Sequence, residues 1–412
     1  MEGDPDRYFP NPFADNKDDK LKIELPAELR EKLLDTLERN IVQVTAAYLH
    51  LKDHTVYTGS SGVAFLHFHL ATTLYAQNDA KRTAHLRESL QILTPTLTHP
   101  RRKPKDCSFL LGVAGPLALG AVVNHHLENA AESRQCANEL KGLYLEHKSV
   151  FLRLPSELLY GHVGYLYSLL FVKCHIPSAV DDALLTELVT MVLDVGESGR
   201  VPSLPSPLMY SWYEEHYLGA AHGLAGIFTV LLQALPAVPS LRTRVLSLVK
   251  PSIDHLLSLA LPSGNFPASL ESVHNDTLVH WCHGAPGCVH LFGHAFQVFG
   301  DQRYLQAAVR CGEVVWRRGL LRKGYGLCHG VAGNAYTFLQ LLRVTGKPEY
   351  FHRALKFTEW CLSSSERTTR TPDNPYSLFE GLAGTLAFFA DMLHNPLDAR
   401  FPALELPVCP QS

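Results

Sequence analysis

The feature that most constrains the fold is a motif, Gly-x-x-Gly followed by an apolar run, which occurs seven times in the 412 residues. Successive copies begin 46 to 62 residues apart, at Gly59, Gly112, Gly161, Gly223, Gly284, Gly330 and Gly381. One such motif has little meaning in a chain with 28 glycines. Seven copies at a near-constant spacing indicate a repeat architecture, because each copy opens the same kind of segment.

Each motif opens a segment that is apolar nearly all round, as in Leu166–Val172 and Ile227–Leu232. A helix of that character is buried on every side. Amphipathic segments lie between these, such as the apolar series at helical spacing from Tyr304 to Val315. Similar helices are predicted near residues 27–50, 80–95, 130–147, 180–198, 240–260 and 350–361. The sequence therefore predicts two concentric layers of helices, with the buried helices inside and the amphipathic ones outside.

The charge balance and hydropathy exclude several classes of protein. With 37 basic and 40 acidic side chains, the chain lacks the basic surplus typical of proteins that bind nucleic acids or membrane surfaces. The longest apolar stretch, Leu224–Val238, is interrupted by Thr229, Gln233 and Pro236. It falls short of the roughly 18 apolar residues that a spanning helix needs. We therefore expect a buried core helix there, no membrane span and no nucleic-acid partner.

The N-terminal residues and the cysteines predict a cytoplasmic protein. The first residues are acidic and polar and carry no signal peptide. Glu2 stands where N-myristoylation would need glycine. Nine cysteines, an odd number spread from Cys107 to Cys409, favour reduced thiols over a disulfide framework. Peripheral association with a membrane remains an open alternative.

The residue immediately before each motif indicates where chemistry would lie. If all seven motifs share one rim, these residues point into one central cavity; they are Thr58, Leu111, Tyr160, His222, His283, His329 and Glu380. Two of the histidines follow a cysteine, in Cys282-His283 and Cys328-His329. Thiolates and imidazole are preferred ligands of Zn²⁺, and two cysteines with one histidine leave a fourth position open, as in catalytic sites. The alternative is a pair of buried thiols beside core histidines.

Other polar residues near the predicted cavity have two interpretations each. His222 has no neighbouring cysteine and is a candidate general acid or base opposite the metal, or a satisfied core histidine. Glu157 and Glu380 can orient His222 or hold a substrate cation, and each is equally plausible as a carboxylate favoured by a helix dipole. Lys323 and Arg370 lie in loops flanking the last two repeats, where they would bind anions or be ordinary solvated charges.

Longer motifs connect the chain to a known family. They are Phe9–Phe13, Ser206–Tyr210, Tyr217–Gly223, Leu278–Gly287, Gly324–Gly330, Ser377–Gly381 and Arg400–Ala403. In these motifs the sequence resembles the eukaryotic LanC-like proteins (the lanthionine synthetase C-like family), relatives of the bacterial lanthionine cyclases. The resemblance is closest to the LanC-like protein 1 and 2 branch and covers about residues 7–405.

The resemblance implies an all-α fold, a double-layered α/α barrel (toroid) with seven inner helices, seven outer helices and seven Gly-x-x-Gly turns. It implies an N-terminal segment, residues 1–24, that contributes to a glutathione site, one barrel domain over residues 25–405, and a tail of residues 406–412. No role for the tail is predicted.

The resemblance also implies the site. One zinc ion per chain would be held by Cys282, Cys328 and His329, with His283 outside its coordination shell. Glutathione would be the co-substrate. Three cationic residues match the family's anion-binding positions; they are Arg7, Lys323 and Arg370. Cations beside the metal make physical sense, because glutathione has two carboxylates and its thiolate adds a third negative charge.

The activity implied is that of a glutathione S-transferase. The thiolate of glutathione, activated by zinc, would add to dehydroalanine or dehydrobutyrine in damaged proteins that have lost phosphate. His222 matches the family's proposed acid or base and would protonate the resulting enolate, and Glu157 falls near the family's carboxylate position. The main alternative is a zinc- and glutathione-binding signalling adaptor or redox sensor without turnover, with signalling proteins as partners. Glycosidases and zinc prenyltransferases also use α/α toroids, and rank below.

Three positions depart from the family pattern. The second motif begins Leu111-Gly112-Val113, where relatives usually have Cys-Gly-Asp, and His162 stands where they have arginine. We expect the loss of the arginine charge at position 162 to alter contacts with a peptide or phosphate. Of the predicted properties, activity on protein substrates is the one that these departures affect most directly.

Overall fold

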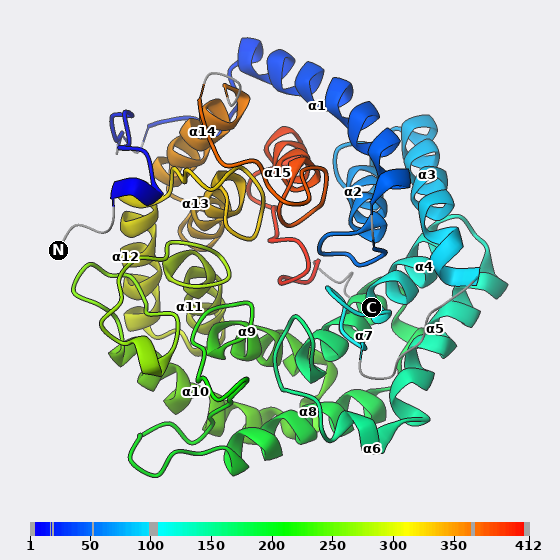
Figure 1. Ribbon diagram of the computed structural model, residues 1–412, viewed down its shortest axis with the longest axis vertical. Coiled ribbons are helices and arrows are strands. Elements are labelled where there is room, and N and C mark those ends of the chain that lie inside the picture. The colour runs from blue at the N-terminus through cyan, green and yellow to red at the C-terminus, as the bar shows by residue number, and fades with distance from the viewer. Residues whose placement is uncertain are drawn as a thin grey trace.

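Seven inner helices form a closed ring in the computed structural model, which describes residues 5–16, 18, 20–51, 53–98, 106–363 and 367–407. The inner helices are α2 (Ser60–Thr72), α4 (Ala114–His126), α7 (His162–His175), α9 (Leu224–Ala234), α11 (Ala285–Phe299), α13 (Val331–Thr345) and α15 (Leu382–His394). Each packs against the next, and α15 packs against α2, which closes the ring (Figure 1).

Seven outer helices surround this ring (Figure 1). They are α1 (Ala27–Ala47), α3 (Asp79–Thr98), α5 (Ala130–Leu145), α8 (Asp182–Ser198), α10 (Arg242–Ser258), α12 (Gln302–Arg318) and α14 (Pro348–Leu362). From α3 onward, each outer helix packs against the inner helix that precedes it, whereas α1 packs against α15. The first and last helices of the chain therefore complete the barrel together, and the predicted double layer is confirmed.

The shorter helical segments lie in the connections. One additional turn, α6 (Lys148–Phe151), precedes the third motif. The 3-10 helices are η1 (Pro5–Arg7), η2 (Tyr48–His50), η3 (Pro177–Ala179), η4 (Leu235–Ala237), η5 (Pro239–Leu241) and η6 (Leu270–Ser272). The residues described here contain three isolated β-bridges and no longer strand.

The two layers follow from the two hydrophobic patterns. In α9 every side chain except Gln233 is buried, as expected for a helix that is apolar all round. In α12 the buried face contains Tyr304, Ala308, Cys311 and Val315, and the opposite face is polar. Inner and outer helices were therefore distinguishable from the sequence.

The glycine motifs allow the loops to cross the first turns of the inner helices. A Cβ on Gly333, the second glycine of its motif, would lie 1.8 Å from the carbonyl oxygen of Leu327. No side chain fits at that distance, so the backbones approach closely only because glycine is present. Gly284 is the one first-position glycine with a positive φ, +109°. Each motif thus places the residue that precedes it above the first turn of an inner helix.

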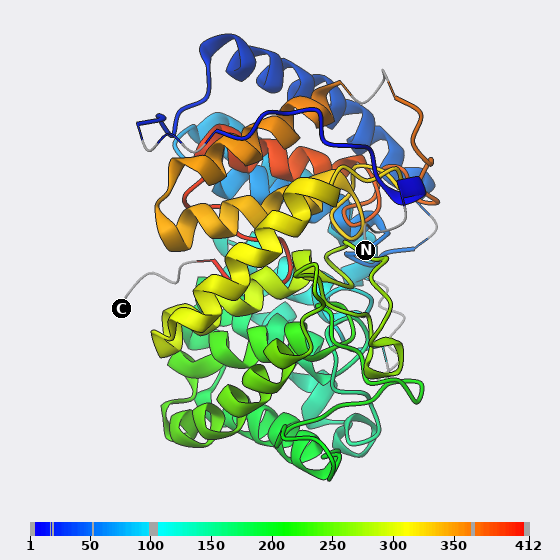
Figure 2. The same cartoon turned by 90° about the vertical axis from the view of Figure 1, so that its left-hand side faces the viewer.

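The barrel has two different ends. In the side view of Figure 2 the irregular loops gather at one end of the helices. We call this end, where the inner helices begin, the front mouth, and the end where they finish the rear mouth. The N-terminal segment reaches the front mouth, because Phe9 donates its N–H to Leu320 O at 2.7 Å and Tyr8 forms a β-bridge with Leu321.

The segment after α15 returns into the ring of inner helices (Figure 1). Phe401 stacks on Trp281 with ring centroids 5.0 Å apart, and Trp281 in turn contacts Phe379 at 5.2 Å. All three rings are fully buried. They form an aromatic layer across the middle of the barrel.

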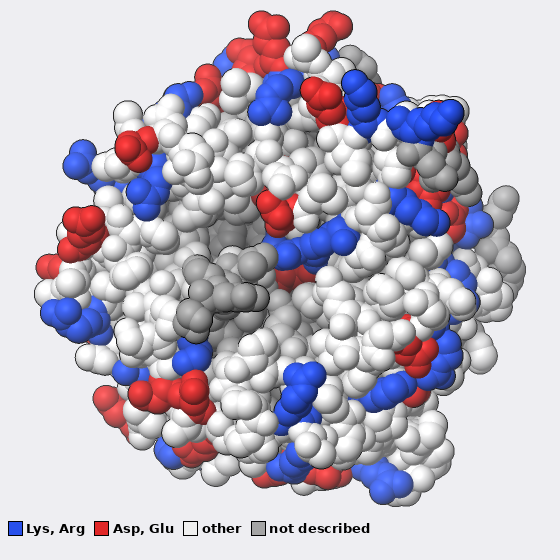
Figure 3. Space-filling model, turned by 180° about the vertical axis from the view of Figure 1, so that it is seen from behind, with Lys and Arg blue, Asp and Glu red and all other residues white. Residues whose placement is uncertain are grey.

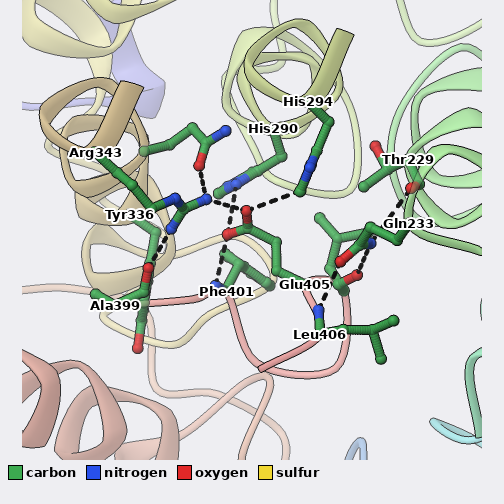
Figure 4. Close-up of polar contacts among 12 residues, drawn as sticks. Thr229, Gln233, His290, His294, Tyr336, Arg343, Ala399, Phe401, Glu405 and Leu406 are labelled. Carbon is green, nitrogen blue, oxygen red and sulfur yellow. Dashed lines mark hydrogen bonds and ion pairs between the residues drawn. The ribbon is translucent and has the colours of Figure 1, made fainter. Parts of the chain in front are cut away.

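A buried polar network anchors the same segment (Figure 4). Glu405 forms an ion pair with Arg343, lies 3.2 Å from His290 Nδ1 and 3.1 Å from His294 Nε2, and accepts the Phe401 N–H at 2.8 Å. A buried carboxylate needs such partners, because leaving it unpaired costs several kcal/mol. The last residues of the predicted barrel domain, from Phe401 to Glu405, therefore help to close the rear of the barrel. Residues 408–412 of the predicted tail, and residues 1–4, lie outside the described part of the chain.

Two further observations concern the expectations about membranes and cysteines. No single helix in the described ranges has both the length and the hydropathy of a membrane span; one pair bent by 118°, Leu224–Ala237 and Pro239–Ser258, meets the criteria only when combined. Seven of the cysteines in the described part of the chain are free. Cys174 is disulfide-bonded, so the expectation that all thiols are reduced is wrong at this residue.

Candidate active site

Three of the predicted ligand residues come together at the front mouth. The ligand atoms of Cys282, Cys328 and His329 all lie within 4.8 Å of one another, and no other such group of three was found among the residues described. The loops before α11 and α13 carry them. Backbone hydrogen bonds hold these loops together, from Cys282 N to Cys328 O at 3.4 Å and from Cys328 N to Phe379 O at 2.8 Å.

The two thiols have different electrostatic environments. A hydrogen bond from the Cys328 thiol, supported by the positive charge of Lys323, lowers the pKa of Cys282. Burial raises the pKa of Cys328 well above its usual range. The Tyr57 hydroxyl hydrogen-bonds Cys328, and its own pKa is raised by burial and by the two sulfurs. Burying two adjacent sulfurs as thiolates is costly unless a cation lies between them.

This donor set fits a zinc ion. Two sulfurs and one imidazole converge within the span of a single metal ion, and zinc prefers these ligand types. A divalent cation deprotonates the thiols that bind it, which would remove the cost of the buried Cys328 thiolate. Three protein ligands leave one coordination position for an external group.

A second group, His222 with Glu157, lies on the same mouth. Glu157 Oε2 is 2.8 Å from His222 Nδ1, and the carboxylate also accepts the backbone N–H groups of Leu159, at 2.9 Å, and of Tyr160. Glu157 is only 1% exposed. Backbone hydrogen bonds therefore hold the carboxylate of Glu157 in place, and its contact with Nδ1 fixes the orientation of the His222 imidazole.

Aromatic rings hold His222 on its other sides. Trp212 stacks on it with centroids 4.2 Å apart, and Tyr160 lies parallel at 6.1 Å. His283 is 6.3 Å away and directly follows Cys282 in the chain. Burial and the neighbouring His222 lower the pKa of His283 to about 4. The neutral His283 therefore lies between the His222–Glu157 pair and the cysteines.

The predicted anion-binding residues lie beside the predicted metal ligands. Lys323 and Arg370 line one pocket of about 140 Å³ with His329 and Glu380. Glu380 accepts a hydrogen bond from Asn374 at 3.0 Å. Of the two candidate carboxylates, Glu157 contacts His222, whereas Glu380 lies with the cations.

Arg7 is attached to the same part of the molecule. The N–H of Arg322 donates to Arg7 O at 3.0 Å, and the N–H of Arg370 donates to Arg322 O at 3.0 Å. These bonds place both arginines beside the loop that carries Lys323. The basic residues Arg7, Lys323 and Arg370, predicted from distant parts of the sequence, are thus brought to one side of the predicted metal ligands.

The departures from the family pattern have structural explanations. His162 is fully buried, its Nδ1 lies 3.0 Å from Ser156 Oγ, and burial lowers its pKa. It is therefore a neutral core residue that supplies no charge to the front mouth. Leu111 and Val113 are partly buried and pack against the hydrophobic core.

Three residues of the front mouth were not identified from the sequence. Tyr57 contacts Cys328, Trp212 stacks on His222, and the ring of His280 lies 6.0 Å from that of His329. No spacing rule selects Trp212, which belongs to a tight turn. Tyr57 directly precedes the rim residue Thr58, and His280 lies two residues before Cys282. Proximity to the rim was the available signal for these two.

Comparison with known proteins agrees with this architecture. Residues 50–406 match the model of the family described as "Lanthionine synthetase C-like protein", so the chain belongs to this family. A solved structure of nisin cyclase has the same fold, with a TM-score of 0.69 at 16% identity over 87% of this chain and 94% of that one.

Two relatives share more of the sequence. The zebrafish (Danio rerio) protein "Glutathione S-transferase LANCL1" is 44% identical over 363 residues, 86% of each chain. The Arabidopsis thaliana "LanC-like protein GCL1" is 33% identical over 411 residues, 93% of this chain and 90% of that one. The similarity thus extends over nearly the whole barrel.

Proposed function

We propose that this protein is a glutathione transferase that adds the glutathione thiol to dehydroalanine or dehydrobutyrine residues in damaged proteins. The observation that carries the proposal is the cluster of Cys282, Cys328 and His329 beside the oriented His222 and beside the pocket of Lys323 and Arg370. We call this pocket the basic pocket; Asp373 and Glu380 also line it. The printed name of the zebrafish relative, a glutathione S-transferase, supports the same class of reaction.

The basic residues provide the binding site for glutathione. The tripeptide carries two carboxylates, and charge-assisted hydrogen bonds to cationic side chains are among the stronger polar interactions. Lys323 and Arg370 share a pocket with His329. Glutathione that binds there through its carboxylates would therefore place its thiol near the proposed metal ligands. A zinc ion held by Cys282, Cys328 and His329 would supply a Lewis acid that lowers the pKa of a bound thiol.

His222 and Glu157 handle the proton. Glu157 accepts a hydrogen bond from Nδ1–H of His222, which leaves Nε2 to exchange a proton with the substrate. The thiol of glutathione releases its proton, its sulfur forms a bond to the β-carbon of the dehydroamino acid, and the electron pair of the double bond moves toward the carbonyl. His222 then protonates the α-carbon and recovers a proton equivalent to the one that the thiol released. One S–H has been added across one C=C bond, so no oxidant or reductant is needed.

The test is adduct formation on a peptide that contains one dehydroalanine. We expect purified protein and glutathione to increase its mass by one glutathione, faster than glutathione alone. A peptide with alanine at that position should stay unmodified. The variant Cys328→Ala should fall to the uncatalysed rate, whereas Cys311→Ala, another buried free cysteine on α12, should retain activity.

The alternative function, a zinc- and glutathione-binding adaptor, predicts a different outcome. Glutathione would bind, as measured by calorimetry, but the wild-type protein would not accelerate adduct formation with either dehydroalanine or dehydrobutyrine. That result would overturn the proposed transferase. We further propose a cytoplasmic location, which seven free cysteines support, and which fractionation would test.

A further inference from the structure

A cavity of about 640 Å³ opens at the rear mouth, on the far side of the aromatic layer from Cys282. Its walls are the last turns of α2, α4, α7 and α15 and part of the segment 398–407. The face seen from this side is hollowed near its middle, with basic and acidic side chains at the edge of the hollow (Figure 3). This volume lies in the range of small-molecule sites, which is about 300–1,000 Å³.

Two arginines on this cavity lack a carboxylate partner. Within the described ranges, no carboxylate forms an ion pair with Arg82 or Arg400. The Nη2 of Arg82 lies 3.3 Å from His126 Nδ1, and the Nε2 of His126 is buried without a partner. Arg400 Nη1 is also buried without a hydrogen bond. Burial and the nearby Arg343 lower the pKa of Arg400, while Glu405, Asp398 and Asp391 act in the opposite direction without forming an ion pair with it.

The carboxylates around the cavity are already engaged. Asp391 forms an ion pair with His69 at 2.8 Å; burial alone would lower the pKa of His69, but this pair raises it. Glu405 belongs to the buried network of Figure 4. Asp398 is exposed and accepts a hydrogen bond from Asn395 at 2.6 Å. Arg82 and Arg400 are therefore the cationic groups of the cavity that have no ion-paired carboxylate among the described residues.

The remaining walls are apolar. Phe65, Phe68 and Phe171 line the cavity, and the rings of Phe68 and Phe171 are 5.9 Å apart. Phe68 also lies 5.8 Å from His126, which contacts Arg82. The aromatic wall thus adjoins a guanidinium group, an arrangement that suits a ligand with an apolar body and an anionic end.

We propose that the rear mouth binds a small organic anion whose carboxylate or sulfonate is held by Arg82 and Arg400 and whose apolar body packs against Phe65, Phe68 and Phe171. Arginine suits this role because its planar guanidinium group forms two parallel hydrogen bonds to an oxyanion. This site is separate from the front mouth and does not depend on the proposed transferase activity.

The test uses two fluorescent probes with nearly the same aromatic body. Anilinonaphthalene sulfonate carries a negative charge, and phenylnaphthylamine has none. We expect saturable binding of the sulfonate, weakened by about tenfold or more in Arg82→Gln and in Arg400→Gln because a charged hydrogen bond is lost. The control Arg87→Gln changes an exposed arginine on the same helix as Arg82 and should leave binding unchanged.

Competition separates the two halves of the proposal. Decanoate should displace the sulfonate probe, whereas inorganic sulfate at the same concentration should not. Equal displacement by both would overturn the claim that the cavity binds the apolar body of the ligand. Sulfonate binding within twofold of wild type in both arginine variants would overturn the whole proposal. So would neutral-probe binding that depends equally on the arginines.

Two controls keep the test decisive. Arg82 is half-buried on an outer helix, so its variant tests the site even if Arg400→Gln fails to fold. Glutathione addition should be unchanged in Arg82→Gln, and probe binding should be unchanged in Cys328→Ala. Loss of both functions in either variant would contradict two independent sites.

Discussion

The two mouths of the barrel use similar residue types in different ways. At the front mouth, thiols, imidazoles and cations converge from loops, and the ion pair there between Arg370 and Asp373, at 3.5 Å, is exposed. At the rear mouth, Glu405 finds Arg343, His290 and His294 inside the protein. A histidine beside a carboxylate therefore does not by itself indicate a functional site. The surrounding residues decide whether the pair only stabilises the fold. The deep rear network is structural, whereas the front cluster is the one that we propose to hold external groups.

Removal of the front histidine should have the largest effect. His222→Asn deletes the group that would protonate the α-carbon, so we expect kcat to fall by about 10²–10⁴-fold, the usual contribution of general acid–base catalysis. Glutathione affinity should change little, because His222 lies apart from the basic pocket. Steady-state kinetics and calorimetry on one preparation check both points. An unchanged kcat would remove His222 from the mechanism.

The buried rear network should dominate stability instead. Glu405→Gln leaves Arg343 without its carboxylate, and breaking a buried pair costs about 3–5 kcal/mol. The matched control is Asp35→Asn, which breaks an exposed pair with Arg39 and should cost less than about 1 kcal/mol. Urea denaturation measures both. Equal losses would mean that the rear network does not anchor the barrel.

The same carboxylate gives a pH dependence. Burial by itself would raise the pKa of Glu405, but Arg343 and His290 hold it well below its usual range. A carboxylate with a lowered folded-state pKa stabilises fully above its unfolded value, about 4.3, and this contribution is lost as the pH falls further. The stability difference between wild type and Glu405→Gln should be constant from pH 7 to 5 and shrink below about pH 4. A difference that grows on acidification would contradict this assignment.

The smallest effect concerns the basic pocket. Lys323→Gln removes one charged contact to glutathione, so KM for glutathione should rise by about tenfold while kcat changes little. Lys347→Gln, an exposed lysine before α14, serves as the control. An equal rise in KM for both variants would indicate general electrostatic attraction rather than a defined pocket.

The sequence predicted the front mouth better than the rear because the front mouth repeats. Every motif places its preceding residue on one rim, so the dipeptides Cys282-His283 and Cys328-His329 could be brought together from spacing alone. The resemblance was needed to select His329 rather than His283 as the third ligand. It was also needed to favour Glu157 over Glu380 as the partner of His222, because that choice depends on which way each side chain points within its turn.

The residues of the rear mouth do not recur at matching positions of the repeats. Arg82, Arg400 and Glu405 occupy unrelated positions in their repeats, and nothing in the sequence indicates that the segment after α15 turns back into the ring. The helices themselves were predictable throughout, since their apolar faces follow the helical period. Contacts between distant segments were predictable only where the repeat related them.

The most direct test of the account is the metal content of protein purified without chelator. We expect one zinc ion per chain in the wild type and in Cys311→Ala, and none in Cys282→Ala or Cys328→Ala, with adduct formation lost in the same two variants. Zinc that persists in both of those variants, or wild-type protein without zinc, would contradict the assignment of Cys282, Cys328 and His329 as the metal ligands.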